Sequence, residues 1–158
     1  MSDTHTPHVP RSHPHRKILP HTPPPWVSSG SPFFITICGT PRNANQFCHD
    51  KIARAIFNAT DFYNTNGTWY SSLLLLMPDH IHALISFPRE SAIKKTISAW
   101  KGYIAKQCGI TWQRDFFDHR LRHDESQQLK ALYIRNNPVR AGLVQSPEAW
   151  SYVWVPEG

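Results

Sequence analysis

The chain has 158 residues, of which 40% are hydrophobic and 12% aromatic, and its formal net charge is +6. This length supports one folded domain with a real core and is hardly enough for two. An odd count of three cysteines without CxxC spacing argues against a disulfide framework and a cysteine zinc site. The longest aliphatic run, residues 73–77, is far too short for a bilayer, and no apolar secretory stretch opens the chain. We therefore expect a cytoplasmic protein without a membrane partner, whose basic charge suits a polyanion.

The first thirty residues differ in composition from the rest. Residues 1–30 are rich in Pro, Ser, Thr and His and contain almost no aliphatic side chains. Such a segment cannot bury enough apolar area to offset its ordering entropy. We predict a disordered or polyproline-like tail over 1–30, without a site of its own, and a single folded domain over 31–158.

Three strands and a helix are expected in the first half of the domain. The β-branched and aromatic run Phe33–Cys38 predicts a strand. Apolar residues at helical spacing predict a helix over about 50–63, and the turn-forming residues 64–67 end it. A second strand is expected over 69–77 and a third over 80–87, joined antiparallel by a tight turn.

One more helix and one more strand follow. Apolar residues at helical spacing predict a helix over about 91–108, and Gly109 stands just past its end. Residues 116–121 predict a fourth strand.

A third helix closes this pattern. Asp124 and Gln127 form an N-cap pairing for a helix that runs to about residue 136 and is stopped by Pro138. Residues 139–155 should pack back onto the domain. The order of elements suggests an α+β fold of the ferredoxin-like, or RRM-like, type: an antiparallel sheet with helices on one face and a C-terminal helix.

Two histidines stand out on the third expected strand. His80 and His82 are two residues apart, so they share one face of the strand while Ile81 takes the other. Two imidazoles side by side on a rigid strand make half of a metal site. An ordinary explanation also exists, since partly buried histidines with satisfied nitrogens are common. Asp79 either orients one imidazole or serves only as a turn residue.

The last expected helix offers a possible complement to this pair. Tyr133 and Asn137 are four residues apart and would project from the same side of a helix. A helix crossing the sheet could present a phenol and an amide oxygen to the histidines, and the amide oxygen can ligate a hard cation. Alternatively, Tyr133 is a half-buried core residue and Asn137 a helix cap.

These segments together resemble a known family. The runs MPDHIHALI at 77–85, WQRDFFDH at 112–119 and YIRNNPVRAGLV at 133–144 are similar to motifs of the single-tyrosine HUH transposases, in particular the REP-associated tyrosine transposases. The resemblance covers about residues 33–152. It implies that His80 and His82 are metal ligands, that Tyr133 is the nucleophile and that Asn137, where some relatives carry glutamine, completes the coordination.

The resemblance also implies an activity. It suggests a metal-dependent endonuclease and strand-transferase that cuts single-stranded or hairpin DNA through a 5′-phosphotyrosine, with Mg²⁺ or Mn²⁺ as cofactor. A tyrosine nucleophile suits this chemistry because the covalent link conserves the phosphodiester bond energy for rejoining. Whether such a protein acts as a monomer or a homodimer stays open.

Basic side chains are the expected DNA contacts, and two other functions stay open. Phosphate contacts are expected from six basic residues near the motifs: Lys94, Lys101, Arg114, Arg120, Arg135 and Arg140. The first alternative is a catalytically silent module that binds hairpin DNA or RNA. The second is a replication-initiator-type HUH nuclease.

Overall fold

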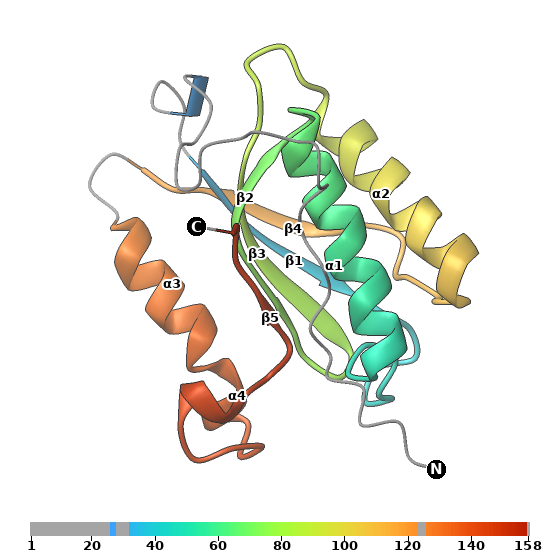
Figure 1. The fold of residues 1–158 in the computed structure, drawn as a ribbon, viewed down its shortest axis with the longest axis vertical. Helices are drawn as coiled ribbons and strands as arrows, with labels where there is room; N and C mark the ends of the chain where they lie inside the picture. The colour runs from blue at the N-terminus through green and yellow to red at the C-terminus, as the bar shows by residue number, and fades with distance from the viewer. Residues whose placement is uncertain (1–25, 28–31, 123–125, 158) are drawn as a thin grey trace.

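A five-stranded antiparallel sheet organises the chain (Figure 1). The computed structural model describes residues 26–27, 32–122 and 126–157. Its strands are β1 (Phe33–Cys38), β2 (Tyr70–Leu76), β3 (His80–Ser86), β4 (Phe117–Arg120) and β5 (Val153–Trp154). Its helices are α1 (Asp50–Thr65), α2 (Ile93–Cys108), α3 (Gln127–Arg135) and α4 (Asn137–Arg140), with a 3-10 turn at Pro147–Ala149.

The strand order β4-β1-β3-β2-β5 places β3 inside the sheet, between β1 and β2. The first four strands in this order, with α1 and α2 as crossovers, make the ferredoxin-like arrangement, so the predicted α+β class is confirmed. β5 adds a fifth strand beside β2, where Trp154 lies opposite Leu74. No helix in the part of the chain that the structure describes is long and apolar enough to cross a bilayer. The tail predicted over 1–30 lies outside the described residues, apart from 26–27.

The two faces of the sheet carry different helices. Along β3, Ile81 and Ala83 belong to a core shared with α1 and α2. Leu84, on the same face as the two histidines, belongs instead to a cluster shared with α3. The helices on one face are therefore α1 and α2, whereas the C-terminal helix α3 lies on the other face, as Figure 1 shows.

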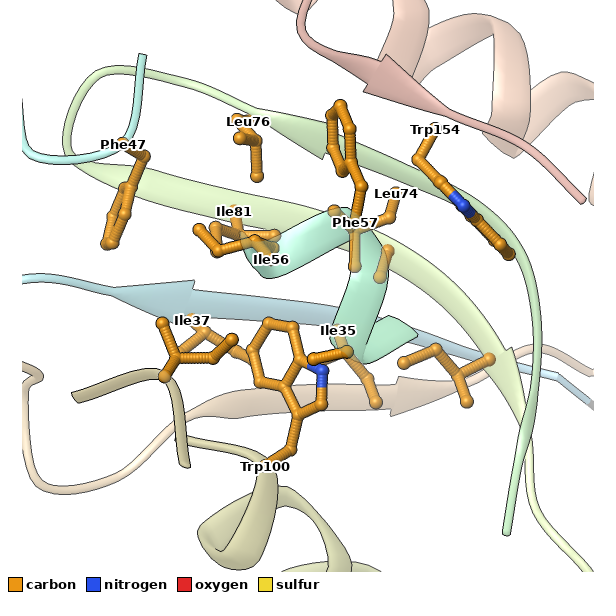
Figure 2. Packing of buried hydrophobic residues seen from close by; sticks show 14 of the residues in the cluster. Ile35, Ile37, Phe47, Ile56, Phe57, Leu74, Leu76, Ile81, Trp100 and Trp154 are labelled. Carbon is orange, nitrogen blue, oxygen red and sulfur yellow. The ribbon is translucent and has the colours of Figure 1, made fainter. Parts of the chain in front are cut away.

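The core under α1 and α2 is closely packed (Figure 2). Ile56 and Phe57 of α1 and Trp100 of α2 lie over strand residues such as Ile35 and Ile81. All five of these side chains are at most 5% exposed. Burying a side chain of this size contributes about 1.5–3 kcal/mol. This face supplies most of the apolar burial that holds the sheet together.

α3 ends close to residue 136 as predicted, but its N-cap and the role of Pro138 differ from the prediction. The helix begins at Gln127 with Ser126 as its N-cap, whose hydroxyl accepts a hydrogen bond from the Leu129 amide at 3.1 Å. Gln127 is thus the first helical residue, and the predicted cap, Asp124, lies outside the described residues. Pro138 does not stop the chain's helical path either: α3 ends at Arg135, and Pro138 stands in the first turn of α4. A proline is tolerated there because first-turn amides have no intrahelical partner.

Candidate active site

His80 and His82 lie side by side on β3. Their ring centroids are 4.7 Å apart and the rings meet edge to face at 78°. β3 is paired with β1 and with β2: His82 has a partner in both strands, and His80 lies opposite Cys38 of β1. The strand periodicity that predicted a shared face is therefore confirmed.

Asp79 holds the first imidazole. Its Oδ1 lies 2.8 Å from His80 Nδ1, while its Oδ2 accepts hydrogen bonds from Arg42 Nε at 2.9 Å and the Asn43 amide at 2.7 Å. Burial alone raises the pKa of Asp79, but the hydrogen bonds from Arg42, Asn43 and His80 outweigh it and hold that pKa well below its usual range. An ionised carboxylate only accepts hydrogen bonds, so His80 Nδ1 donates to Asp79 and Nε2 is the ring nitrogen that remains for a cation. Asp79 thus contacts the imidazole, as one of its two sequence interpretations predicted.

Thr36 holds the second imidazole. It lies opposite His82 in the register of β1 and β3, and its Oγ1 is 2.9 Å from His82 Nδ1. Burial, and then the charges of His80 and Arg140, lower the pKa of His82 to about 3. His82 is therefore neutral at pH 7. In the tautomer whose Nδ1 donates to this hydroxyl, His82 Nε2 keeps a lone pair for a cation.

This donor set fits a divalent cation. Metal-binding histidines typically donate their second ring nitrogen to a carboxylate or another acceptor, which fixes the tautomer and the ring orientation. Both histidines have such a partner at Nδ1. Among residues 26–27, 32–122 and 126–157, no third His, Cys, Asp or Glu joins the pair. A bound cation would need further ligands of another kind, such as an amide oxygen, water or a phosphate oxygen.

Asn137 is not on the same helix as Tyr133. It opens α4, and its backbone carbonyl accepts a hydrogen bond from the Ala141 amide at 2.9 Å. Within the described residues its side chain makes no hydrogen bond to His80 or His82. Its role as third ligand stays a prediction.

Tyr133 lies on the face that carries the histidines. Its ring meets the Phe34 ring edge to face at a centroid distance of 6.5 Å. The same Phe34 ring stacks on His82 at 5.4 Å. One aromatic ring therefore links the phenol-bearing side chain to the imidazole pair. Tyr133 is 51% exposed, so this side chain is not part of the core.

Of the six predicted DNA-binding residues, Arg140 lies closest to this arrangement. Its guanidinium carbon is 4.0 Å from the Tyr133 ring centroid, and its Nη2 donates to the Tyr133 carbonyl at 2.9 Å. Arg135 lines a groove between α3 and β2 together with Ser72 and Gln127. Both arginines thus belong to the α3 side of the sheet.

The other four do not join the site. Lys101 is 8% exposed, and its ammonium donates to the backbone carbonyls of Gln113 at 2.9 Å and Arg114 at 3.3 Å, so it tethers the segment before β4 to α2. Arg120 packs over Phe33, on the face of α1 and α2. Lys94 is exposed on α2 and Arg114 is exposed before β4. Their DNA contacts stay predictions.

Sequence reasoning missed the partners that orient the histidines. Thr36 is distant in sequence from His82 and is identified only by the β1–β3 register. Arg42 lies in a polar loop and reaches Asp79 because that loop folds over the β2–β3 turn, where the Gln46 amide donates to the Pro78 carbonyl at 2.8 Å. The one available signal was Thr36 itself, a polar residue in the apolar strand Phe33–Cys38. Such a residue suggests a hydrogen-bond partner on the neighbouring strand.

Fold and site together define a ferredoxin-like α+β domain with a paired-histidine strand and a tyrosine-bearing helix on one face. No protein-family model matches the sequence. The chain is similar to a candidate REP-associated tyrosine transposase of Haemophilus influenzae, with 29% identity over 97 residues, which cover 50% of this chain and 54% of that protein. The match thus spans about half the length of the curated relative.

Solved structures agree on the fold. A REP-associated tyrosine transposase bound to a REP hairpin superimposes with a TM-score of 0.65 at 18% identity, over 90% of this chain and 81% of that one. A candidate transposase from Deinococcus radiodurans gives a TM-score of 0.51 at 18% identity, over 68% of this chain and 90% of that one. The resemblance to REP-associated tyrosine transposases that the sequence motifs predicted is therefore confirmed.

Proposed function

We propose that this chain is a metal-dependent transposase that nicks and rejoins single-stranded, hairpin-containing DNA through Tyr133. The observation that carries the proposal is the shared contact with Phe34, which brings Tyr133 to the same face as His80 and His82. The curated relative and the hairpin-bound structural neighbour support the substrate class.

Tyr133 supplies the nucleophile. Its phenol oxygen attacks a phosphorus atom of the DNA strand, the new O–P bond makes a 5′-phosphotyrosine, and the bond to the 3′ oxygen breaks. The phenol proton is lost, and the leaving 3′ oxygen takes up a proton to become a free hydroxyl, so attack by a 3′-hydroxyl reverses the step. A neutral phenol is a weak nucleophile, so the attack depends on nearby positive charge that favours the phenolate.

The histidine pair supplies the binding groups for that charge. His80 Nε2 and His82 Nε2 would hold a divalent cation, Mg²⁺ or Mn²⁺, with the amide oxygen of Asn137 as the candidate third ligand. When bound, such an ion polarises a non-bridging phosphate oxygen and stabilises developing negative charge. Asp79 and Thr36 contact Nδ1 of His80 and His82, which fixes the orientation of both rings and leaves Nε2 of each for the cation.

A covalent-adduct assay tests the proposal. The chain is incubated with end-labelled single-stranded hairpin DNA and Mn²⁺ or Mg²⁺, then denatured and separated by electrophoresis. We expect an adduct that Tyr133→Phe abolishes while hairpin binding stays close to that of wild type. An adduct in Tyr133→Phe would identify another nucleophile. Hairpin binding by wild type without an adduct under either ion would instead support the binding-module function.

A further inference from the structure

Two cationic side chains contact the ring of Tyr133. Lys130, one helical turn earlier on α3, places its ammonium 5.3 Å from the Tyr133 ring centroid. Arg140 of α4 places its guanidinium carbon 4.0 Å from the same centroid. The Lys130 ammonium is also 4.9 Å from the Phe34 ring, which stacks on His82. The Lys130 ammonium is therefore close both to the ring of the proposed nucleophile and to the aromatic ring that stacks on His82.

Within the segments that the structure describes, neither Lys130 nor Arg140 forms an ion pair with a carboxylate. Arg140 uses Nη2 to bind the Tyr133 carbonyl, which fixes the guanidinium while leaving other N–H groups free. Among the described residues the Lys130 ammonium lies over two aromatic rings and makes no side-chain hydrogen bond, so its three protons remain available there. The positive charges of Lys130 and Arg140 lie together beside the Tyr133 ring, and this arrangement can bind an anion.

The anion that must come to Tyr133 in the proposed reaction is a phosphodiester. We infer that Lys130 and Arg140 form a phosphate clamp, in which both side chains bind the non-bridging oxygens of the phosphate that Tyr133 attacks. This inference rests on the proposed function and adds Lys130 to the substrate-binding residues. As the O–P bond to Tyr133 forms and the bond to the 3′ oxygen breaks, these preplaced donors stabilise the charge that develops on the phosphate.

Packing offers a different explanation of Lys130, because a lysine can cover aromatic rings through its methylene groups and a cation–π contact. Lys130→Met distinguishes packing from phosphate binding, since methionine preserves an unbranched apolar side chain and removes the charge. Lys51→Met, at an exposed position in the first turn of α1, is the matched control. Lys130→Arg keeps the charge with a different shape.

The measurement is the single-turnover rate of adduct formation at saturating hairpin DNA, with the DNA dissociation constant determined separately. For Lys130→Met we expect a rate about 10²-fold lower, as for the loss of one preplaced donor, with an unchanged melting temperature. The dissociation constant should change far less, because many other phosphates contribute to binding. Lys130→Arg should recover most of the rate, and Lys51→Met should match wild type.

A substrate change then identifies the phosphate. A methylphosphonate at the mapped cleavage position replaces one charged oxygen by a methyl group. This substrate should slow the wild-type protein by a larger factor than it slows the Lys130→Met variant. The variant has already lost the side chain that binds the removed charge. Equal slowing of both proteins, or a wild-type rate for Lys130→Met, would overturn the clamp while leaving the proposed function intact. Absence of any adduct with wild type would overturn the proposed function and the clamp together.

Discussion

Among the described residues, 18 buried hydrophobic side chains form one cluster on the face of the sheet covered by α1 and α2, and three of them are fully buried tryptophans. On the face crossed by α3, the corresponding cluster has six, and Ile134 is the single buried residue of α3 itself. The polar and aromatic groups of the candidate site, among them His82 and Tyr133, lie on this second face, where the apolar cluster is smaller. One side of the sheet therefore carries most of the stability, and the other carries the chemistry.

This division has a physical reason. A site that must admit a DNA strand needs exposed side chains and a helix that is only partly buried against the sheet. A metal-binding histidine pair needs a rigid strand. β3 meets both demands, because Ile81 and Ala83 anchor it in the large cluster while His80 and His82 face α3. Substitutions on the α1/α2 face should therefore change stability, and substitutions on the α3 face should change metal binding or catalysis.

The largest effect on stability is expected at the centre of the α1/α2 face. Trp100 is 0% exposed and packs in the main cluster, so Trp100→Ala removes a large buried side chain and leaves a cavity. We expect the free energy of unfolding to fall by about 3–5 kcal/mol, measured by chemical denaturation. A loss below about 1 kcal/mol would contradict the assignment of stability to this face.

A smaller effect is expected at the partners of the histidines, and it concerns metal affinity. Asp79→Asn removes the charged acceptor at His80 Nδ1, and Thr36→Val removes the hydroxyl at His82 Nδ1. Each change should weaken Mn²⁺ binding by about 10–100-fold, measured without DNA by the electron paramagnetic resonance signal of free Mn²⁺.

Thr60→Val is the control for Thr36→Val. Thr60 is buried in α1, where its hydroxyl donates to the Ile56 carbonyl at 2.8 Å, and it touches neither histidine. We expect Thr60→Val to bind Mn²⁺ as wild type does. If both threonine variants keep the wild-type affinity, Thr36 does not orient a ligand.

The pH dependence of stability should report the burial of His82. The pKa of this side chain falls from its ordinary 6.5 to about 3 on folding. Above pH 6.5 neither the folded nor the unfolded chain binds a proton there. Between pH 6.5 and 3 the unfolded chain binds a proton that the folded chain does not. The free energy of unfolding therefore decreases as the pH falls through this window, by at most about 1.4 kcal/mol per pH unit.

The variant that isolates this effect is His82→Gln, compared with wild type by denaturation from pH 6 to 4.5 in the presence of EDTA. The variant should lose stability less steeply as the pH falls. Asp79 adds little in this range, because its lowered pKa acts mainly below the ordinary carboxyl value of 3.8. Identical slopes for the two proteins would show that His82 titrates normally in the folded chain.

The smallest effect on stability is expected on the outer side of α3. Leu132 is 56% exposed, so Leu132→Ala removes little buried area. We expect the free energy of unfolding to change by at most about 0.5 kcal/mol in the same denaturation assay used for Trp100→Ala. A loss comparable to that of Trp100→Ala would mean that α3 is buried against something in solution, which would abolish the contrast between the faces.

Much of the fold was predictable because strands and helices of the large core have strong hydrophobic periodicity. The first strand has the predicted bounds, Phe33–Cys38, and α2 ends at Cys108 with Gly109 after it in the left-handed conformation at φ 71°. The start of α3 was harder to predict, since a half-exposed helix has a weak apolar pattern and several nearby polar residues can serve as its N-cap. The sequence offered Asp124, whereas the structure uses Ser126.

The candidate site was predictable to the extent that it is local in sequence. The shared face of His80 and His82 follows from strand geometry alone. The role of Thr36 depends on strand register, and the burial of Lys101 depends on how the segment before β4 folds back onto α2. Such contacts join residues far apart in the chain, so no spacing rule could identify them. The contact of Lys130 with Phe34 is of the same kind.

The identity of the residue that becomes attached to DNA tests the central claim most directly. After nuclease trimming of the adduct, trypsin should release residues 131–135, because cleavage follows Lys130 and Arg135, and Tyr133 is the one hydroxyl-bearing residue in that peptide. We predict that mass spectrometry finds the remaining nucleotide on this peptide. A nucleotide on a peptide that contains Tyr63, Tyr70 or Tyr103 would contradict the account.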